Sequence, residues 1–138
     1  MERTLVLIKP DAFAAHHTGE IITKYEQAGL KILAMKLLHM TKELAGKHYA
    51  EHVGRPYYED LEGFITSAPL VAMVLAGDNA IAAVRELHGK TDPQEAAEGT
   101  IRKLFAASKG RNAVHASDSP VSAEREIHIF FNEIEIVD

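Results

Sequence analysis

The chain lacks cysteine and tryptophan, and aromatic residues make up only 7% of its 138 residues. The absence of cysteine excludes disulfide bonds, thiolate zinc sites and a cysteine nucleophile. Long apolar runs are missing as well. The first apolar run, Leu5–Ile8, stops at Lys9 and Pro10, whereas a membrane span needs about 18 to 20 apolar residues and a signal peptide needs a longer apolar region than this one. We therefore expect a cytoplasmic protein without a membrane partner.

Positive charge is also in deficit, because 15 Lys and Arg residues face 20 Asp and Glu residues and leave a net charge of −5. A protein that binds nucleic acid through its overall field usually carries the opposite sign, so no nucleic-acid partner is expected. Net charge does not exclude a local basic pocket. The length and the ordinary shares of hydrophobic (46%) and charged (25%) residues predict one globular domain over residues 1–138.

Hydrophobic periodicity predicts strands and helices in alternation along the chain. The predicted strands are Thr4–Ile8, Lys31–His39, Leu70–Ala76 and Asn112–His115. The predicted helices are Gly19–Ala28, one that starts at Thr41 and runs past His48 toward His52, Tyr58–Ser67, Asn79–His88 with Asn79 or Asp78 as N-cap, and one capped by Ser119 with Pro120 in its first turn.

The pattern weakens between Gly89 and Gly110, where we expect a long loop with one or two helical turns near Ile101–Phe105. Loops this long in a compact domain are often functional. The core of the element order, β-α-β-β-α-β, is that of the ferredoxin-like arrangement. The fold class predicted is α/β (α+β): a four-stranded antiparallel sheet covered by helices, with a strand order that follows from this motif.

His115 is the first candidate for chemistry, because it ends a predicted strand just before a capped helix. One interpretation is an ordinary polar loop histidine. The other is a nucleophile or general base, since imidazole has an unperturbed pKa of about 6.5. Glu126 lies in the following helix, where it would either fix the tautomer of the ring or face solvent. Ser117 and Asp118 follow His115 closely, but near-contiguous residues do not converge as a hydrolase triad.

The candidates for binding are basic and aromatic side chains. Lys9, Arg85, Arg102 and Arg111 could meet a polyphosphate or be ordinary surface charges, and Lys9 is distinctive because it ends a buried strand. Tyr49 and Tyr57 flank a helix break. They could pack in the core or provide a flat surface on which a base stacks.

Two familiar patterns fail. The segment Gly89–Thr91 looks like the end of a phosphate-binding P-loop, but the first glycine is replaced by Val84 and a helical pattern precedes the segment. His48 and His52 are four residues apart and could share a helix face, but a third zinc ligand is not evident and the His-Glu-x-x-His pattern is broken. The residues alone therefore lead to a small α/β domain with a candidate histidine.

Several segments together resemble the nucleoside diphosphate kinase family. They occur in the order of the family over essentially the whole chain: ERTLVLIKPD, GEII, RPYY, SAPLVAMV, GKTDP, GTIR, NAVHASDS and SAERE. The resemblance implies transfer of the γ-phosphoryl group from a nucleoside triphosphate to a diphosphate by a ping-pong route. The resemblance also implies broad base specificity and a role in maintaining the NTP and dNTP pools.

The resemblance also implies roles for individual residues. His115 matches the nucleophile, Glu126 the carboxylate that orients its ring, and Ser117 a serine beside both. The positions that match nucleotide contacts are Lys9 (ribose and transferring phosphate), Tyr49 (phosphate side), Tyr57 (base stacking, where Phe is common), Arg85, Thr91 and Arg102 (phosphates), and Asn112 (sugar hydroxyl). Mg²⁺ would bridge the phosphates of the substrate, and Glu51 and Asp118 would act on it through water.

Some positions depart from the family pattern. Ala116 follows His115 where many relatives have glycine, Lys103 follows Arg102, and Lys109 stands where the base pocket is often apolar. The resemblance implies a homo-oligomer, either a tetramer or a hexamer. A non-catalytic relative that only binds nucleotides, or a regulatory domain of the same fold class, would be the alternatives to an active kinase, because fold alone does not separate them.

Overall fold

The computed structural model describes residues 1–137. The strands are β1 (Glu2–Ile8), β2 (Lys31–Leu38), β3 (Leu70–Gly77) and β4 (Val114–Ala116). The helices are α1 (Pro10–Ala14), α2 (Thr18–Gln27), α3 (Lys42–His48), α4 (Tyr58–Ile65), α5 (Ala80–His88), α6 (Ile101–Phe105), α7 (Pro120–Phe130) and the 3₁₀ helix η1 (Glu133–Glu135).

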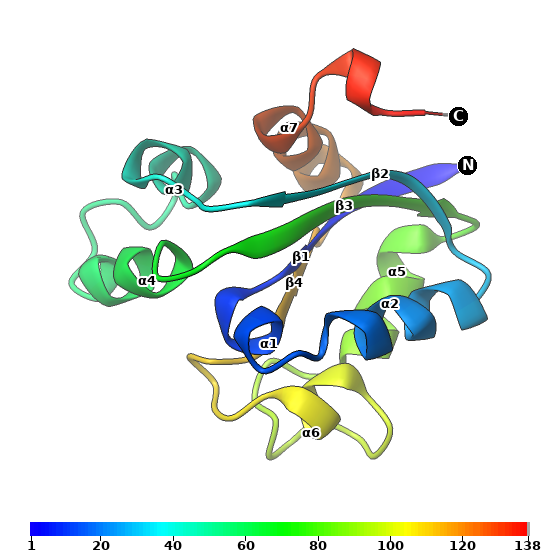
Figure 1. Cartoon of the computed structure of the whole chain (residues 1–138), viewed down its shortest axis with the longest axis horizontal. Coiled ribbons are helices and arrows are strands. Elements are labelled where there is room, and N and C mark those ends of the chain that lie inside the picture. Colours follow the sequence, from blue (N-terminus) through cyan, green and yellow to red (C-terminus); the bar gives the residue numbers. More distant parts are fainter. Residues whose placement is uncertain (138) are drawn as a thin grey trace.

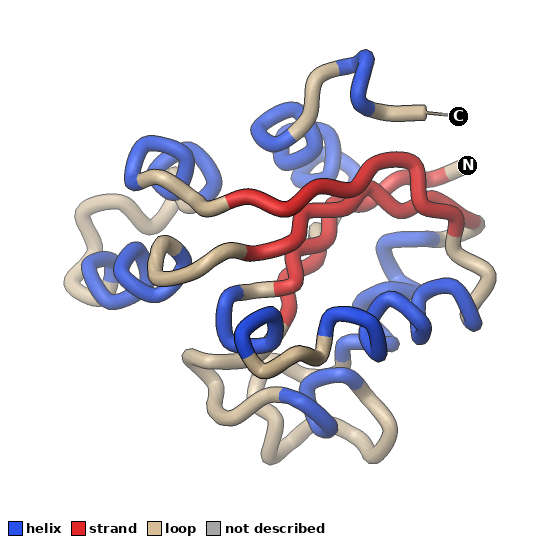
Figure 2. The backbone as a smooth tube through the Cα atoms, in the orientation of Figure 1, coloured by secondary structure: helices blue, strands red, loops and turns tan. Residues whose placement is uncertain are grey.

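The strands form one antiparallel sheet in the order β2-β3-β1-β4 (Figures 1 and 2). This is the strand order of the ferredoxin-like arrangement, so the predicted fold class is confirmed. The long strands β1 and β3 pair in the centre, from Glu2 opposite Gly77 to Ile8 opposite Val71. The short strand β4 pairs with β1 at one edge and places His115 opposite Leu7.

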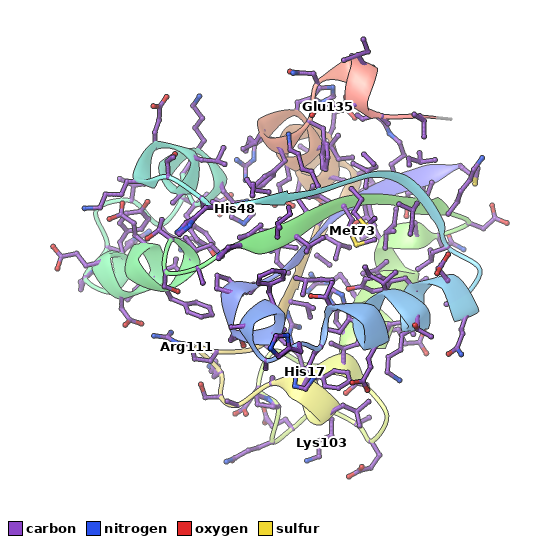
Figure 3. All side chains as sticks on the ribbon, in the orientation of Figure 1. His17, His48, Met73, Lys103, Arg111 and Glu135 are labelled. Atoms are coloured by element: carbon purple, nitrogen blue, oxygen red, sulfur yellow. The ribbon has the colours of Figure 1, made fainter. Side chains whose placement is uncertain are left out.

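Each face of the sheet is buried under its own helices. Alternate residues of β1 point to opposite faces, so that Val6 and Ile8 belong to one apolar cluster and Leu5 and Leu7 to the other. Helices α1, α2, α5 and α6 cover the first face, and α3, α4 and α7 cover the second (Figure 1). Met73 of β3 lies wholly buried in the first cluster (Figure 3). Burial of both faces explains why β3 is apolar throughout.

Capping side chains fix where several helices begin. The hydroxyl of Thr41 accepts a hydrogen bond from the Leu44 amide, and Thr100 and Ser119 cap α6 and α7 in the same way. Pro120 fills the first position of α7, where a missing N–H costs nothing. The cap at Ser119 was predicted from the sequence and is confirmed. Thr41 was predicted as the first residue of a helix and is its N-cap, with α3 beginning at Lys42.

Other details differ from the sequence-based predictions. Helix α3 ends at His48, so His52 is not on its face, because the chain turns away at Tyr49. Asn79 lies at the N-cap of α5 but in the left-handed region (φ 53°), and its side chain forms no cap hydrogen bond. Strand β4 covers Val114–Ala116 instead of Asn112–His115, since only these residues pair with β1. Helices α1 and η1 were not predicted, and within residues 1–137 no helix has the length and apolar character to cross a membrane.

Candidate active site

His115 lies in the middle of strand β4 with one ring nitrogen anchored and the other free. Its Nε2 is 2.9 Å from Oε1 of Glu126 on helix α7. Among residues 1–137, no hydrogen bond is made by Nδ1. A carboxylate on Nε2 selects the tautomer that carries its proton there, which leaves the lone pair of Nδ1 available for attack on an electrophile.

Glu126 is itself held in place by Ser117 and, through it, by the backbone of β1. The Ser117 hydroxyl donates to Oε1 of Glu126 at 2.8 Å, and the Ser117 oxygen accepts a hydrogen bond from the Leu5 amide at 3.1 Å. Ser117 is fully buried and Glu126 nearly so. The strand β1 backbone therefore orients the serine, the serine orients the carboxylate, and the carboxylate orients the histidine.

The surroundings keep the His115 imidazole neutral. Burial lowers the pKa of His115 below its ordinary value, the hydrogen bond and charge of Glu126 oppose this, and the nearby charges of Lys9 and Arg102 add to the lowering. Burial by itself would raise the pKa of the Glu126 carboxyl, but the hydrogen bonds from His115 and Ser117 bring that pKa below its ordinary value. A neutral ring beside an ionised carboxylate is the form that can act as a nucleophile at neutral pH.

Two arginines contact the backbone on either side of His115. Arg102 donates from Nη2 to the carbonyl of Val114 at 2.9 Å, and Arg85 donates from Nη1 to the carbonyl of Ala116 at 3.4 Å. Arg102 also donates to the carbonyls of Gly89 and Asn112. The two guanidinium groups therefore contact the β4 backbone at the residues directly before and after the candidate nucleophile.

These arginines line a polar cavity of about 450 Å³ together with Thr91 and Lys109. Gly89 makes the turn into this cavity. Its φ is 83°, and a Cβ atom there would lie 2.7 Å from the Thr100 hydroxyl, so only glycine fits. Gly89 follows helix α5 directly, which confirms that the segment is not a P-loop. Four basic side chains line this cavity against two carboxylates, those of Asp92 and Glu95. The excess of positive charge suits a polyphosphate.

Lys9 follows the last residue of β1 and lies near both His115 and His48, since its charge lowers the pKa of each. Its Nζ donates to Oδ1 of Asn112 at 2.9 Å, and its amide donates to the carbonyl of Ala113. Burial and the charge of Arg102 lower the pKa of Lys9 to about 8, while Asp11 acts in the raising direction. The ammonium is thus a partly desolvated cation close enough to influence His115.

The backbone just before β4 is strained. Ala113 has a φ of 73° and is fully buried, and it is held by the Lys9 amide on one side and by the Asp11 carboxylate, which accepts from its N–H at 3.0 Å, on the other. Non-glycine residues rarely adopt this conformation, at a cost of about 1 to 3 kcal/mol. The turn after β1 therefore constrains the entry into the histidine strand.

A second, smaller cavity of about 170 Å³ lies on the α3 side of His115. Tyr49, Glu51 and Asp118 line it together with His115 and Glu126. Burial raises the pKa of the Tyr49 hydroxyl, which stays a neutral hydrogen-bonding group. Both carboxylates and the tyrosine thus border the candidate nucleophile.

The structure brings most of the predicted site residues to these two cavities, and Tyr57 contacts His52, a residue that lines the smaller one. Tyr57 is about half exposed (51%) and lines neither of these two cavities; its hydroxyl is 2.6 Å from Nδ1 of His52. Lys109 is closer to the arginines than the sequence suggested, because it lines the larger cavity rather than an apolar pocket.

Sequence reasoning missed two features of the site. Asp11 was not recognised as the acceptor for the Ala113 amide, because nothing local to Ala113 signals a positive φ. His48 was considered only as a partner of His52, yet its ring packs edge-on against His115 with the ring centres 4.7 Å apart. Its place on the buried stripe of α3 was a signal that it points toward the sheet.

Comparisons with known proteins agree on one family. The sequence model described as "Nucleoside diphosphate kinase" matches residues 2–136. The chain is 55% identical over 137 residues to nucleoside diphosphate kinase from Listeria monocytogenes serotype 4b (strain CLIP80459), covering 99% of this chain and 93% of that protein. It is 56% identical to the enzyme of the same name from Archaeoglobus fulgidus, covering 99% of this chain and 91% of the relative.

Solved structures lead to the same family. A crystal structure of nucleoside diphosphate kinase from Aquifex aeolicus superimposes with a TM-score of 0.96 at 46% identity and covers 99% of both chains. The halophilic enzyme from Halobacterium salinarum, solved in complex with CDP, gives a TM-score of 0.96 at 45% identity and covers 99% of this chain and 91% of that one.

Proposed function

Because the chain belongs to the nucleoside diphosphate kinase family and is an enzyme that transfers phosphate between nucleotides, we propose that the phosphoryl group passes through His115. The observation that carries this proposal is the 2.9 Å contact between Nε2 of His115 and Glu126, which leaves Nδ1 without a partner among residues 1–137. The route is ping-pong: a nucleoside triphosphate phosphorylates the histidine, the diphosphate leaves, and a second diphosphate collects the group.

In the first half-reaction, the Nδ1 lone pair attacks the γ-phosphorus as the bond to the β,γ-bridging oxygen breaks. The proton stays on Nε2, so the ring gains positive charge, which the Glu126 carboxylate stabilises at 2.9 Å. Ser117 positions that carboxylate. In the second half-reaction, a β-phosphate oxygen of the acceptor attacks the phosphorus, the N–P bond breaks, and its electron pair returns to Nδ1.

The phosphates of the nucleotide would bind in the larger cavity, which basic side chains line. Arg85, Arg102 and Thr91 line the larger cavity and would hold the phosphate oxygens, because most of phosphoryl-transfer catalysis is positioning and charge stabilisation. Lys9 would contact the transferring phosphoryl group and the ribose, with Asn112 as its partner at 2.9 Å and as a ligand of the sugar hydroxyl. Tyr49 would complete the phosphate side next to His115.

Tyr57 would receive the base. Its ring is half exposed, as a stacking surface must be, and the hydrogen bond to His52 fixes its orientation. Stacking uses the face of a base and not its edge, so it supports broad base specificity and hence a role in balancing NTP and dNTP pools.

The family generally uses Mg²⁺ with its nucleotides, and the residues present fit such an ion. Glu51 and Asp118 offer carboxylate oxygens at the cavity beside His115, and Mg²⁺ prefers oxygen ligands while keeping several waters. The substrate phosphates would hold most of the ion, with the two carboxylates acting through water. When bound, Mg²⁺ neutralises charge on the transferring phosphates.

We propose further that residues 1–138 act as one domain in a homo-oligomer, either a tetramer or a hexamer. One sheet with packed helices on both faces supports the single domain. Membership of the family supports the assembly and a cytoplasmic location. The acidic net charge of −5 supports the expectation of no nucleic-acid partner.

The test is phosphoenzyme formation. Purified protein mixed with Mg²⁺ and γ-labelled ATP should acquire label before an acceptor is added, and the label should be acid-labile and base-stable. Adding GDP should discharge it into GTP. His115→Gln should abolish labelling and lower the transfer rate by about 10⁴-fold or more, with an unchanged circular dichroism spectrum.

The matched control is His128→Gln, on the exposed side of helix α7. It should label like the unmodified protein. Normal labelling of His115→Gln would overturn the assignment of the nucleophile, and an unmodified protein that binds ADP but never labels would be a non-catalytic relative.

A further inference from the structure

His48 is a buried histidine to which the proposed phosphoryl transfer gives no task. It comes from the end of helix α3 (Figure 3) and is only 4% exposed. Neither of its ring nitrogens has a hydrogen-bond partner among residues 1–137. An imidazole N–H or lone pair buried without a partner is costly, about 1 to 3 kcal/mol, so such a group calls for an explanation.

The unpartnered ring lies beside two groups that ligate metals. His48, His115 and Glu126 each offer one ligand atom, and these atoms all lie within 4.8 Å of one another. All three residues line the cavity of about 170 Å³ on the α3 side of the sheet, so the atoms face a common space. Within the part of the chain that the structure describes, this is the only such cluster.

We propose that His48, His115 and Glu126 form a binding site for a divalent d-block cation of the Zn²⁺ type, and that occupancy of this site blocks phosphorylation of His115. The blocking part rests on the proposed function, since it requires His115 to be the nucleophile. The site is an inhibitory one and is distinct from the Mg²⁺ that accompanies the nucleotide.

The donor set selects the class of metal. Two imidazoles and one carboxylate suit Zn²⁺, Co²⁺ and Cu²⁺, whereas Mg²⁺ prefers oxygen ligands and dehydrates reluctantly. A set of three protein ligands leaves the fourth coordination position of the metal to water. Excess Mg²⁺ will therefore not displace the bound cation, although the two ions are present together during turnover.

The geometry needs only a small adjustment. Zn–N and Zn–O distances of about 2.0 to 2.2 Å put tetrahedral ligand atoms roughly 3.4 Å apart. The His115 and Glu126 atoms are already 2.9 Å apart, and the widest separation within the cluster is at most 4.8 Å. Rotation of the His48 ring toward the shared cavity closes the difference without breaking a hydrogen bond of that ring.

Nearby charge limits the affinity. Arg125 approaches the second oxygen of Glu126 at 3.8 Å, and the Lys9 and Arg102 charges also act on His115. These cations oppose a metal ion, so we expect micromolar and not nanomolar binding. The blocking follows from the ligands themselves. A metal bound to Glu126 and to Nε2 of His115 displaces the proton from Nε2. The neutral ring then carries its proton on Nδ1, so the Nδ1 lone pair is no longer free to attack phosphorus, and the carboxylate no longer stabilises positive charge on the ring.

The binding test uses Co²⁺ as a spectroscopic substitute for Zn²⁺ on the nucleotide-free protein. We expect one Co²⁺ per chain with the intense visible absorption of a four- or five-coordinate ion, displaced by stoichiometric Zn²⁺ and unaffected by millimolar Mg²⁺. His48→Phe keeps an aromatic ring against Phe130 but removes a ligand, and should weaken Zn²⁺ binding by at least about tenfold.

His128→Phe is the matched control, because His128 is exposed and lies beside Glu124 and Glu133 as a rival surface site. It should leave Zn²⁺ affinity unchanged. If His48→Phe does not fold, His115→Asn at the same cavity should show the same loss of binding. The site is overturned if folded His48→Phe or His115→Asn binds Zn²⁺ as tightly as the unmodified protein. It is also overturned if only His128→Phe loses Zn²⁺ binding.

The blocking test measures phosphoenzyme formation at free Zn²⁺ fixed by a metal buffer, because ATP itself binds zinc. Rates should fall in step with Zn²⁺ occupancy. If the protein forms phosphoenzyme normally with Mg²⁺ and ATP but binds no Co²⁺ in the spectroscopic test, this inference is overturned and the proposed function stays intact. A Co²⁺ spectrum in a protein that never becomes phosphorylated supports the metal site and overturns His115 as nucleophile.

Discussion

Two segments form the candidate site in different ways: Val114–Glu126, the nucleophile segment, and Gly89–Arg111, the phosphate loop. In the nucleophile segment, Ser117 and Glu126 are buried, the Ser117 hydroxyl donates to Glu126 at 2.8 Å, and Glu126 is 2.9 Å from Nε2 of His115. In the phosphate loop most side chains are exposed, and Arg102 alone bonds to three backbone carbonyls.

This difference indicates a division of labour. A buried and fully bonded network has little freedom, which suits a group that must be aimed at a reacting atom. A loop whose side chains are mostly exposed can adapt to the nucleotide that enters. Changes in the nucleophile segment should therefore lower the rate of the chemical step, and changes in the phosphate loop should mainly weaken substrate binding.

The largest effect is expected from Glu126→Gln. The amide cannot stabilise the positive charge that the His115 ring gains, so kcat should fall by about 10²- to 10³-fold, while KM changes little. Steady-state kinetics with ATP and a diphosphate acceptor, fitted to a ping-pong scheme, measures both. Glu124→Gln, two residues away on the same helix and exposed, is the control. A rise in KM at constant kcat would contradict the assignment of the chemical step to the nucleophile segment.

A smaller effect is expected from Arg102→Met. The loss of charge-assisted hydrogen bonds to phosphate and to the loop carbonyls should cost about 1.5 to 3 kcal/mol, seen chiefly as a higher KM for the nucleotide. Arg111→Met is the control, because Arg111 instead lies over the Phe64 ring and near Asp60. A kcat loss as large as that of Glu126→Gln would show that the two segments do not divide the work.

The smallest effect is expected from alkaline pH, which titrates Lys9 between the two segments. Burial and Arg102 lower the pKa of the Lys9 ammonium to about 8, so the free enzyme loses this positive charge as pH rises above about 8. The value of kcat/KM should then fall by up to roughly tenfold per pH unit. In Lys9→Arg the side chain stays charged, and that alkaline decline should be absent. A profile with the same decline in both proteins would assign it to another group.

Sequence could predict those features that have a local cause. The runs Leu5–Ile8 in β1 and Leu70–Ala76 in β3 are apolar because both faces of the sheet are covered, and Ser119 with Pro120 marks the start of α7. His115 and Glu126 were candidates because a strand end precedes a capped helix. The family resemblance supplied their roles and those of the other site residues, which stay proposals.

Features that depend on distant contacts could not be predicted. The positive φ of Ala113 accompanies two contacts from residues far away in sequence: Asp11 accepts its N–H and the Lys9 amide donates to its carbonyl. The neighbourhood of His48 and His115 arises from the packing of α3 on α7 beneath the sheet. Spacing along the chain suggested His52 as the partner of His48 instead, and that pairing fails because α3 ends one turn earlier.

The guanidinium contacts to the carbonyls of Val114 and Ala116 have a further consequence. If Arg85 and Arg102 bind the phosphates as proposed, binding is coupled through these contacts to the peptide units beside His115, and the part of the Arg102→Met effect that appears in kcat measures this coupling. Substitution of Tyr57, which within residues 1–137 makes no such contact to β4, should therefore alter nucleotide affinity without changing the orientation of the nucleophile.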